Sequence, residues 1–440
     1  MAVENSFRRE AGNCSHDADD WARVLLRGMF DAAVAAADPA LVLSRHLPPP
    51  PKGRCIVVGA GKAAASMAAA VEDAWPDIAL TGCVAVPHGY KAQCRRIRVI
   101  EAGHPVPDAS SQRAAEEILA AVGGTGPDDL VLALISGGGS ACMSLPAPGL
   151  SLHDKQVTNR LLLASGLDIR TMNAVRRRIS AIKGGRLAAA AAPAKVITLA
   201  ISDIPGDDAG AIASGPTAPD WGAGEELTSV AAALGPALPE KVRQLLCAPG
   251  KVLPLPHAEP IRTIATACDA LAAAAGFARS HGIEPVILGD DLEGEARSVA
   301  AAMAARVTGV SRPVVLISGG ETTVTVTCPE PGRGGRNTEF LLALTLALKG
   351  RAGVWALAAD TDGEDGASLG AAGALAGPET LPRAAAAGLD PVASLASHDS
   401  GTFFDALDDL VVTGPTLTNV NDFRAILVLP QDFAPDSTGA

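Results

Sequence analysis

Apolar and polar residues follow each other along this chain in a pattern that predicts strands alternating with helices. Short apolar runs rich in Val, Ile and Leu predict buried strands, and longer segments with apolar residues three or four positions apart predict amphipathic helices. The predicted strands cover residues 54–58, 81–86, 96–100, 130–135, 195–202, 261–265, 284–288, 313–317, 322–327, 354–359, 410–413 and 424–429. The predicted helices cover residues 18–37, 62–74, 109–121, 152–165, 169–183, 268–280, 293–307, 337–349 and 401–408.

This alternation predicts an α/β protein with two Rossmann-like domains, mainly parallel sheets and an interdomain cleft. A chain of 440 residues is too long for one ordinary core. Prolines crowd between residues 216 and 260, which we interpret as an interdomain connection with one or two short helices. We therefore expect an N-terminal domain over 1–240 and a C-terminal domain over 258–440, with the strand 261–265 opening the second one.

The composition is that of a soluble globular protein, with 48% hydrophobic and 19% charged residues. A net charge of -12 and the absence of a basic stripe argue against a nucleic-acid partner. The eight cysteines show neither CxxC nor zinc-ligand spacing, which favours reduced thiols in a cytoplasmic protein. The charged N-terminus is not typical of a signal peptide, and no apolar stretch reaches the roughly 18 residues that span a bilayer.

Three predicted strands run directly into a glycine turn. Glycine lets the backbone approach a ligand and aim successive N–H groups at it, and a following helix adds its positive end. Three such turns predict a site for a phosphorylated or otherwise anionic ligand. The turn residues are Gly59 and Gly61 in CIVVGAGKAAA, Ser136, Gly137, Gly138, Gly139 and Ser140 in LVLALISGGGSA, and Ser318, Gly319, Gly320 and Glu321 in PVVLISGGET.

Two cations stand at the predicted starts of helices. Lys62 falls in the first turn of the helix 62–74, where a cation is unfavourable by roughly 0.3–1 kcal/mol unless an anion lies beside it. Arg336 precedes Asn337, the predicted N-cap of the helix 337–349, in a glycine-rich loop that also holds the less constrained Arg333. Both cations therefore predict contacts with an anionic ligand, and the alternative for each is a solvated side chain.

Acidic loops follow two of the predicted strands, where ligands gather in open α/β sheets. Asp203 and Asp207 in SDIPGDD, or Asp360 and Asp362 in ADTDGEDG, could hold Mg²⁺ through oxygen, and either pair could supply a base for a substrate hydroxyl. Acidic residues are also common in turns for structural reasons. For any single aspartate, a purely structural role in the turn is therefore as well supported as a role in the site.

Other polar residues give weaker signals. Arg176, Lys183 and Arg186 lie on or just after the predicted helix 169–183, where a salt-bridged scaffold is equally expected, and His88, His104 and His398 are weaker loop candidates. Glu321 beside the third turn would suit a sugar hydroxyl or a metal.

The segment GAGKAA at 59–64 matches the dinucleotide fingerprint GxGxxA. That fingerprint also needs an acidic residue at the end of the second strand to bind the ribose hydroxyls. Here the strand TGCVAV continues into Pro87, His88 and Gly89 without an acid. The P-loop pattern also fails, because Ile56 stands where its first glycine belongs and Ala63 follows the lysine.

Taken together, these motifs resemble the glycerate 2-kinases with a MOFRL domain, often also named hydroxypyruvate reductases. The resemblance covers nearly all of residues 50–429. Its segments are GAGKAAASM, EAGHPVPD, LISGGGSA, NAVRRRISAIKGGRLA, ISDIPGDD, ASGPT, SGGETTVTV, GRGGRNTEF, AADTDGEDG and VVTGPTLTNVNDFRAILV. One departure is ASLGAAGALAG after AADTDGEDG, where the family usually carries an Asn-containing stretch.

The resemblance implies transfer of the ATP γ-phosphoryl group to the 2-hydroxyl of D-glycerate, with Mg²⁺, and it places the catalytic lysine and arginine at Lys62 and Arg336. We expect the turns 136–140 and 318–321 to bind the nucleotide phosphates and the glycerate carboxylate, in an order left open. Asp203 is our candidate for the base or a metal contact, with Asp207 as a second metal ligand. A homodimer is possible. The alternatives are an NAD(P)H-dependent hydroxypyruvate reductase and a non-catalytic nucleotide or sugar-acid binding protein.

Overall fold

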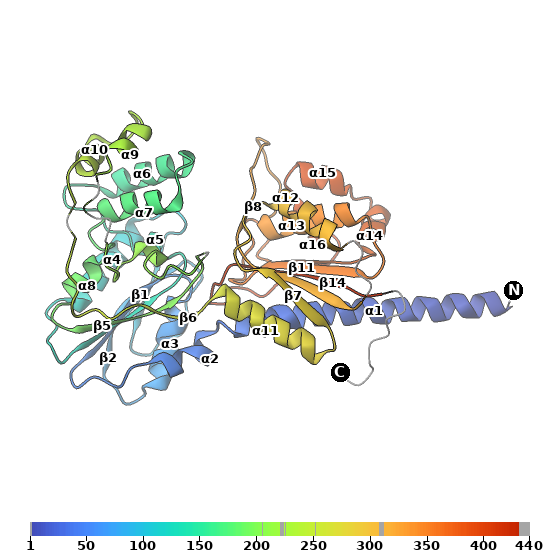
Figure 1. Ribbon diagram of the computed structural model, residues 1–440, viewed down its shortest axis with the longest axis horizontal. Helices are drawn as coiled ribbons and strands as arrows, with labels where there is room; N and C mark the ends of the chain where they lie inside the picture. Colours follow the sequence, from blue (N-terminus) through green and yellow to red (C-terminus); the bar gives the residue numbers. More distant parts are fainter. Residues whose placement is uncertain are drawn as a thin grey trace. The chain divides into compact units, whose positions relative to one another are not determined.

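The computed structural model describes residues 2–204, 206–220, 224, 226–250, 252–307 and 312–430, with side chains from residue 18 onward. The chain divides into two compact units (Figure 1). The N-terminal unit comprises residues 37–266 and 417–419, and the C-terminal unit comprises residues 1–36, 267–416 and 420–440. This division differs from the predicted ranges 1–240 and 258–440, because the first 36 residues belong with the C-terminal half and three late residues belong with the N-terminal half.

The N-terminal unit contains a six-stranded sheet in the order β3-β2-β1-β4-β5-β6, and every pairing in it is parallel. All residues of β1 and β4 are buried, as expected for strands covered on both faces. The predicted α/β fold with a parallel sheet is therefore confirmed here. The strands are β1 (Cys55–Ala60), β2 (Leu80–Pro87), β3 (Arg98–Ala102), β4 (Leu130–Ile135), β5 (Lys195–Ile201) and β6 (Arg262–Ala265).

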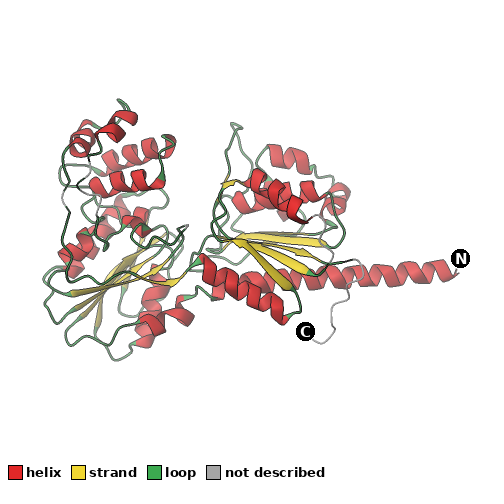
Figure 2. Cartoon of the chain, in the orientation of Figure 1, coloured by secondary structure: helices red, strands yellow, loops and turns green. Residues whose placement is uncertain are grey.

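Helices connect the strands of this sheet and cover it (Figure 2). Asp108 caps α4 and Ser151 caps α6, and each side chain accepts a hydrogen bond from the backbone N–H three residues later. Both predicted helix starts are therefore confirmed. The predicted helix 169–183 ends earlier, at Arg178, because Ser180 forms a bridge with Pro146 instead of a further helical turn. The helices are α2 (Pro39–Val42), α3 (Ala64–Ala74), α4 (Ala109–Val122), α5 (Gly139–Cys142), α6 (Leu152–Ala164), α7 (Ile169–Arg178), α8 (Arg186–Ala190), α9 (Thr228–Ala233) and α10 (Glu240–Cys247).

The proline-rich stretch 216–260 is part of the N-terminal unit and is not an interdomain connection. Val242 and Leu246 of α10 share a buried apolar cluster with Val175 of α7 and Ala231 of α9. The strand β6 that follows pairs in parallel with β5, so it completes the first sheet and does not open the second. In this part of the chain, the N-terminal unit ends at residue 266 and the C-terminal unit continues from residue 267.

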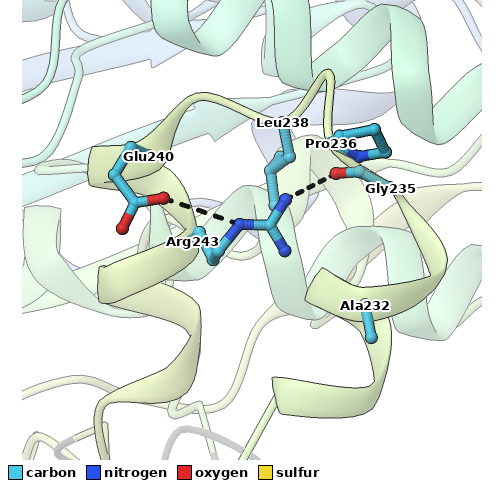
Figure 3. A pocket seen from close by; sticks show the side chains of 6 residues that line it. All are labelled: Ala232, Gly235, Pro236, Leu238, Glu240 and Arg243. Atoms are coloured by element: carbon cyan, nitrogen blue, oxygen red, sulfur yellow. Dashed lines mark hydrogen bonds and ion pairs between the residues drawn. The ribbon is translucent and has the colours of Figure 1, made fainter.

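Arg243 is one of the residues that line a surface pocket beside α9 and α10 (Figure 3). The guanidinium donates to the carbonyl oxygens of Ala231 at 3.0 Å and Gly235 at 2.5 Å, which satisfies the C-terminal end of α9. The predicted site residues are absent from its described lining, which consists of Ala232, Gly235, Pro236, Leu238, Glu240 and Arg243.

The sheet of the C-terminal unit has the order β13-β12-β11-β14-β9-β7. Only β7 and β9 pair in parallel, and the other four pairings are antiparallel. The prediction of mainly parallel sheets is therefore corrected for this unit. The apolar run of a buried strand does not indicate whether the strand pairs in parallel or antiparallel. The sequence also does not predict β12, because its residues GALA are typical of an alanine-rich helix. The strands are β7 (Glu284–Gly289), β9 (Val314–Ser318), β11 (Val354–Asp360), β12 (Gly373–Ala376), β13 (Leu410–Val411) and β14 (Asp422–Val428), beside the short pair β8 (Gly294–Glu295) and β10 (Thr322–Thr323).

Helices lie on both faces of this second sheet, with α1 and α11 on one face and α12, α13 and α16 on the other (Figure 1). The first helix contacts α11, β11 and β14. Phe30 of α1 lies with its ring centroid 5.9 Å from that of Phe423 in β14, which ties the two chain ends into one core. The helices are α1 (Ala2–Ala35), α11 (Ala267–Ser280), α12 (Ala296–Val307), α13 (Arg336–Leu348), α14 (Thr380–Ala386), α15 (Pro391–Ala396) and α16 (Ser400–Asp405).

Candidate active site

The first two glycine turns lie against each other at the carboxyl ends of β1 and β4. The Lys62 amide donates to the Gly137 carbonyl at 2.8 Å, and the Ala63 amide donates to the Ser136 hydroxyl at 3.0 Å. Gly61 has φ +131, and a Cβ at this position would lie 2.3 Å from the Ser136 hydroxyl. Only glycine permits this approach, so the turns 59–62 and 136–140 form a single structural element.

Polar side chains from four segments converge on the turn 136–140. A Cβ built on Gly137 would meet Asp203 Oδ2 at 1.8 Å, so this carboxylate lies directly against the turn. Asp203 also accepts a hydrogen bond from Asn419 Nδ2 at 3.2 Å. A Cβ built on Gly138 would lie 3.2 Å from His104 Nε2 and 3.6 Å from Lys62 Cγ. The structure thus brings Lys62, His104 and Asp203 together, and Asn419 is a member that sequence reasoning missed.

The backbone of the turn 136–140 presents N–H groups to this cluster. Among the described residues, the amides of Gly137 and Gly138 donate to none of the backbone acceptors, although both neighbouring amides, of Ser136 and Gly139, do. Unused amide donors next to a lysine are the features of an anion site. The predicted anion-binding role of this turn stays a prediction.

Lys62 lies slightly outside its predicted position. The helix α3 begins at Ala64 with Ala63 as its N-cap, so Lys62 belongs to the turn before the helix rather than to its first helical turn. Its side chain is partly buried and its stem lies beside Gly138. Because Lys62 precedes the helix, the helix end disfavours its charge less than predicted. Its stem contacts the turn 136–140 directly.

A second cation reaches the same turn from the opposite end. Lys183, which the sequence assigned equally to a scaffold, is 3% exposed and donates to the Ser140 carbonyl at 2.6 Å and the Ser140 hydroxyl at 2.7 Å. Arg176 and Arg186 have the scaffold role: Arg186 donates to the carbonyls of Arg177 and Lys183, and Arg176 donates to Asn173.

The predicted metal ligand Asp207 lies in the same loop as Asp203 but in a different environment. It adopts the left-handed region with φ 52, and its amide donates to the Ile204 carbonyl at 3.0 Å. Among the described residues, there is no group of three or more His, Cys, Asp or Glu side chains that could hold a metal ion. The pairing of Asp203 with Asp207 at a metal ion stays a prediction.

In the C-terminal unit, Arg336 lies beside the third glycine turn and is surrounded by carboxylates. Its Nε donates to Asp422 at 2.8 Å, its Nη2 donates to Asp360 at 2.7 Å, and its Nη1 donates to Glu321. Asp422 and Asp360 are buried, whereas Glu321 is exposed. Although burial alone lowers the pKa of Arg336, the three carboxylates outweigh that effect and raise it. Arg336 is thus a permanent cation held in place by its own unit.

The start of α13 differs from the prediction. Gly335 is the N-cap and Arg336 the first helical residue, whereas Asn337 was expected to cap the helix. The carboxylate of Asp365 accepts from the amides of Asn337 and Thr338, both at 2.9 Å. The positive end of this helix therefore holds a carboxylate of the chain itself, supplied by the acidic loop 359–366.

Buried charges complete the surroundings of the third turn. Burial raises the pKa of the Asp365 carboxyl to about 6, against the lowering effect of its amide donors. Arg424, which is fully buried, donates to the Gly319 carbonyl at 2.8 Å and also to Asp422. Neither Asp365, Asp422 nor Arg424 was predicted as a site residue, although all three fall inside the motif segments AADTDGEDG and VVTGPTLTNVNDFRAILV.

The remaining histidine and arginine candidates have structural partners. His398 is buried, and its Nδ1 lies 2.9 Å from Glu339, which also pairs with Arg297. Arg333 is exposed, and its amide donates to Asp399. His88 is exposed, with Nε2 3.8 Å from Asp108. Of the three histidines singled out in the sequence, His104 is the one placed at a glycine turn.

Comparison with known proteins supplies the family. Residues 25–247 match the family described as Domain of unknown function (DUF4147), and residues 314–422 match the MOFRL family. The chain is 36% identical over 406 residues to D-glycerate 2-kinase of Thermotoga maritima, covering 90% of this chain and 96% of the relative. The chain belongs to the glycerate kinase family that carries a MOFRL domain.

Two further proteins that are similar to this chain carry different names. The crystal structure of glycerate kinase from Thermotoga maritima has a TM-score of 0.83 and 33% identity, with 93% of this chain and 100% of that chain covered. A protein of Agrobacterium vitis, 53% identical over 95% of this chain and 98% of its own length, carries the provisional name hydroxypyruvate reductase. At the level of the family, the relatives support glycerate phosphorylation.

No helix in the described part of the chain is both long enough and apolar enough to cross a membrane.

Proposed function

We propose that this protein is an ATP-dependent kinase that phosphorylates the 2-hydroxyl of D-glycerate and releases 2-phosphoglycerate and ADP. The observation that carries the proposal is that Lys62 and Asp203 converge on the turn 136–140. Among the described residues, the Gly137 and Gly138 amides of this turn donate to no backbone acceptor. ATP and glycerate are both anions, and this arrangement offers charge and N–H donors to an anion beside a carboxylate that can take a proton. The named function of the relatives agrees with this chemistry.

The charges near the two turns suggest which ligand each one binds. The turn 136–140 lies beside Lys62, Lys183 and the carboxylate of Asp203. The turn 318–321 lies beside Arg336 and Arg424 but also beside Glu321, Asp360 and Asp422. A net positive surrounding favours the more highly charged ligand, so we assign the ATP phosphates to the turn 136–140.

The reaction needs placement and charge stabilisation more than covalent help. The glycerate hydroxyl oxygen forms a bond to the γ-phosphorus, the bond to the ADP oxygen breaks, and the hydroxyl proton passes to a carboxylate. Asp203 is suited to accept it, because the hydrogen bond from Asn419 holds its Oδ2 in place, and this same oxygen lies against Gly137 of the turn. Lys62 stabilises the negative charge on the transferring group.

The residues around the turn also fit a magnesium ion. Mg²⁺ prefers oxygen ligands and is usually bound by one or two carboxylates together with substrate phosphates. Asp203 offers such an oxygen, with Asp207 on the same loop as the second candidate. The ion would neutralise charge on the phosphates when it is bound.

Arg336 has a separate role in this proposal, that of a cation for a reacting anion. Three carboxylates hold its guanidinium, and Glu321 is the exposed one among them. A ligand phosphate or carboxylate would replace the exposed Glu321 more easily than the buried Asp360 or Asp422, because no buried charge is then left unpaired. The predicted interdomain cleft, cytoplasmic location and homodimer stay predictions.

The direct test is a coupled assay that follows ADP release from ATP and D-glycerate, with the position of the phosphate read by ³¹P NMR. Phosphate on the 2-oxygen supports the proposal, whereas phosphate on the 3-oxygen would correct the hydroxyl choice. ADP release that does not depend on D-glycerate would exclude this acceptor.

Replacing Lys62 tests the proposed catalytic cation. In Lys62→Met the apolar stem beside Gly138 is kept and the charge is lost, so we expect kcat to fall by at least about a hundredfold, as for loss of a charge-stabilising donor. The melting temperature should stay within a few degrees of wild type. Lys52→Met is the matched control, because Lys52 is exposed before β1, and it should keep full activity. A Lys62→Met enzyme with wild-type turnover would remove Lys62 from the catalytic residues.

The name of the Agrobacterium vitis relative keeps a hydroxypyruvate reductase as the second candidate. The end of β2 is Pro87, so the strand lacks the acidic residue that the ribose hydroxyls of NAD(P)H require. Incubation with NADH and hydroxypyruvate decides the matter: a falling nicotinamide absorbance would favour reductase. Thermal stabilisation by ATP without any ADP release would favour a non-catalytic binding protein.

A further inference from the structure

Lys183 is a buried cation for which the described residues provide no carboxylate partner. It is 3% exposed, and its ammonium donates only to the carbonyl and the hydroxyl of Ser140. Burial lowers the pKa of Lys183 well below its ordinary value, and the neighbouring cations Lys155 and Arg176 lower it further. A buried charge without a partner costs stability, so this residue is unfavourable for folding and calls for another explanation.

The contacts of Lys183 lead directly into the turn 136–140. Ser140 is the last residue of that turn, and its hydroxyl lies 3.1 Å from the Ser214 hydroxyl. Ser214 donates in turn to Asn173 Oδ1 at 3.3 Å. Lys183, Ser140, Ser214 and Asn173 thus form a buried polar chain that begins behind the anion-binding amides.

A second observation concerns the backbone around Ser214. The consecutive residues Ala213, Ser214 and Gly215 all have positive φ, at 50, 61 and 62. Two of them carry side chains, for which this left-handed conformation is strained. The amides of Gly184 and Gly185, which directly follow Lys183, donate to the carbonyls of Ser214 and Gly215 and hold this strained segment in place.

We propose that Lys183 is a positioning residue of the turn 136–140, which fixes Ser140 and places a positive charge behind the amides that bind the ligand's phosphates. This inference rests on the proposed function of the turn as the ATP phosphate site. The strain at residues 213–215 and the unpartnered charge are both explained if the segment 183–185 is arranged for the bound anion, which supplies the missing negative charge. A merely structural lysine would instead be expected to stabilise the unbound protein.

The chain offers a matched control in Lys155. It is 2% exposed, its ammonium donates to the Leu145 carbonyl at 3.3 Å, and burial lowers its pKa to about 7. The two lysines thus share residue type, burial and a lowered pKa, but only Lys183 contacts the turn 136–140. Any difference between their methionine variants reports on the turn.

The experiment compares the full-length wild-type protein with Lys183→Met and Lys155→Met. Isothermal titration calorimetry measures the affinity for ATP and for tripolyphosphate, and calorimetric scanning measures the melting temperature. We expect Lys183→Met to melt at or above the wild-type temperature, because a buried charge is removed, while its affinity for both probes falls at least tenfold. Lys155→Met should also melt at or above the wild-type temperature and bind both probes within twofold of wild type. In steady-state assays, Lys183→Met should show a raised KM for ATP, with a smaller change in kcat than Lys62→Met.

The other outcomes count against the inference, the proposed function or both. Wild-type affinity in Lys183→Met would show that the charge does not serve the ligand, and a variant that melts well below wild type would show a structural lysine. Equal losses of affinity in both variants would show a general effect of buried charge. If wild type binds the probes but transfers no phosphate, the proposed function fails while the binding comparison still stands. If wild type binds neither probe, both fail.

Discussion

Gly61 illustrates how one residue without a side chain keeps the turns 59–62 and 136–140 together. Its φ of +131 is unfavourable for any residue with a Cβ, and such an atom would lie 2.4 Å from the Ser136 carbonyl oxygen. The backbone of Ser136 belongs to a buried strand end and cannot yield. Both the conformation and the contact therefore require glycine here.

We expect Gly61→Ala to lower the free energy of unfolding by about 2–4 kcal/mol, from the unfavourable φ and the clash together. Kinase activity should be lost in the folded fraction, because the turn 136–140 is displaced. Urea denaturation and the coupled assay measure the two effects. Gly89→Ala is the control: it has φ +87 but nothing within 4 Å of a built Cβ, so it should lose only about 1 kcal/mol and keep its activity. Equal losses in both variants would show that the clash contributes nothing.

At the scale of elements, the start of α13 depends on a carboxylate from another loop. Asp365 accepts from the second and third amides of the helix, those of Asn337 and Thr338, and from the Thr338 hydroxyl. Arg336 is the first residue of the helix and directly precedes them. A helix start held in this way fixes the direction of the Arg336 side chain. The acidic loop 359–366 thus positions the cation, rather than only offering a metal ligand.

The raised pKa of Asp365 predicts a pH dependence of stability. Its folded pKa of about 6 exceeds the unfolded value of about 3.9, so the folded state binds more protons between these values. The free energy of unfolding should therefore fall as the pH rises from about 4 to about 6, by the contribution of this one group. Urea denaturation at several pH values should show that Asp365→Asn lacks this fall.

Asp154 provides a control of opposite sign. It is the third residue of α6 and forms the capping box with Ser151, whose amide and hydroxyl donate to the Asp154 carboxylate and hold its pKa below the ordinary value. Its stabilising contribution is present above the unfolded pKa and is lost as the pH falls through the folded one. Asp154→Asn should therefore remove a rise of stability with pH below about pH 4 and leave the fall between pH 4 and 6 intact. A pH profile of Asp365→Asn that matches wild type would contradict the assignment.

At the scale of the whole molecule, the chain crosses between its two units more than once. The helix α1 at the N-terminus packs in the C-terminal unit, and residues 417–419 return to the N-terminal unit. Through this return, Asn419 reaches Asp203, 216 residues away in sequence. The matching family segments 25–247 and 314–422 therefore do not correspond to the two units.

A core residue of α1 tests this arrangement. Phe30 is fully buried against Phe423, so Phe30→Ala should cost about 3–5 kcal/mol. The loss should appear in the C-terminal unit, as faster hydrogen exchange of the β14 amides than of the β1 amides. Val24→Ala is the control, because Val24 is 71% exposed on the same helix, and it should change stability by less than about 0.5 kcal/mol. Faster exchange in β1 alone would contradict the assignment of α1.

Local patterns were enough to predict most strands and helices. The apolar runs of β1 and β4, the capping pair Ser151 and Asp154, and the strand-to-glycine junctions each depend on neighbours in sequence. The prediction failed where distant segments compete: β6 joined the first sheet, and α7 ended before Gly184. Asp365 displaced Asn337 as the partner of the α13 amides because its carboxylate arrives from 28 residues away.

For the candidate site, residue chemistry and spacing identified Lys62, Asp203, Arg336 and the three glycine turns. Sequence alone could not find Asn419 or the importance of Lys183, because nothing in an alanine- or threonine-rich segment shows what lies beside it in space. Likewise, the sequence predicts that Arg336 binds an anionic ligand, whereas in the structure its guanidinium donates to three carboxylates of the chain itself.

The sequence by itself determined the elements, the α/β class, the three turns and the family, because strand periodicity, glycine freedom and motif order are properties of neighbouring residues. Tertiary structure decided strand direction in the second sheet, the membership of α1 and residues 417–419, and the partner of each buried charge. The physical reason is that hydrogen bonds and ion pairs between distant segments depend on which segments meet after the chain has folded. Lys183 became significant only when the fold placed it on Ser140 without a carboxylate partner among the described residues.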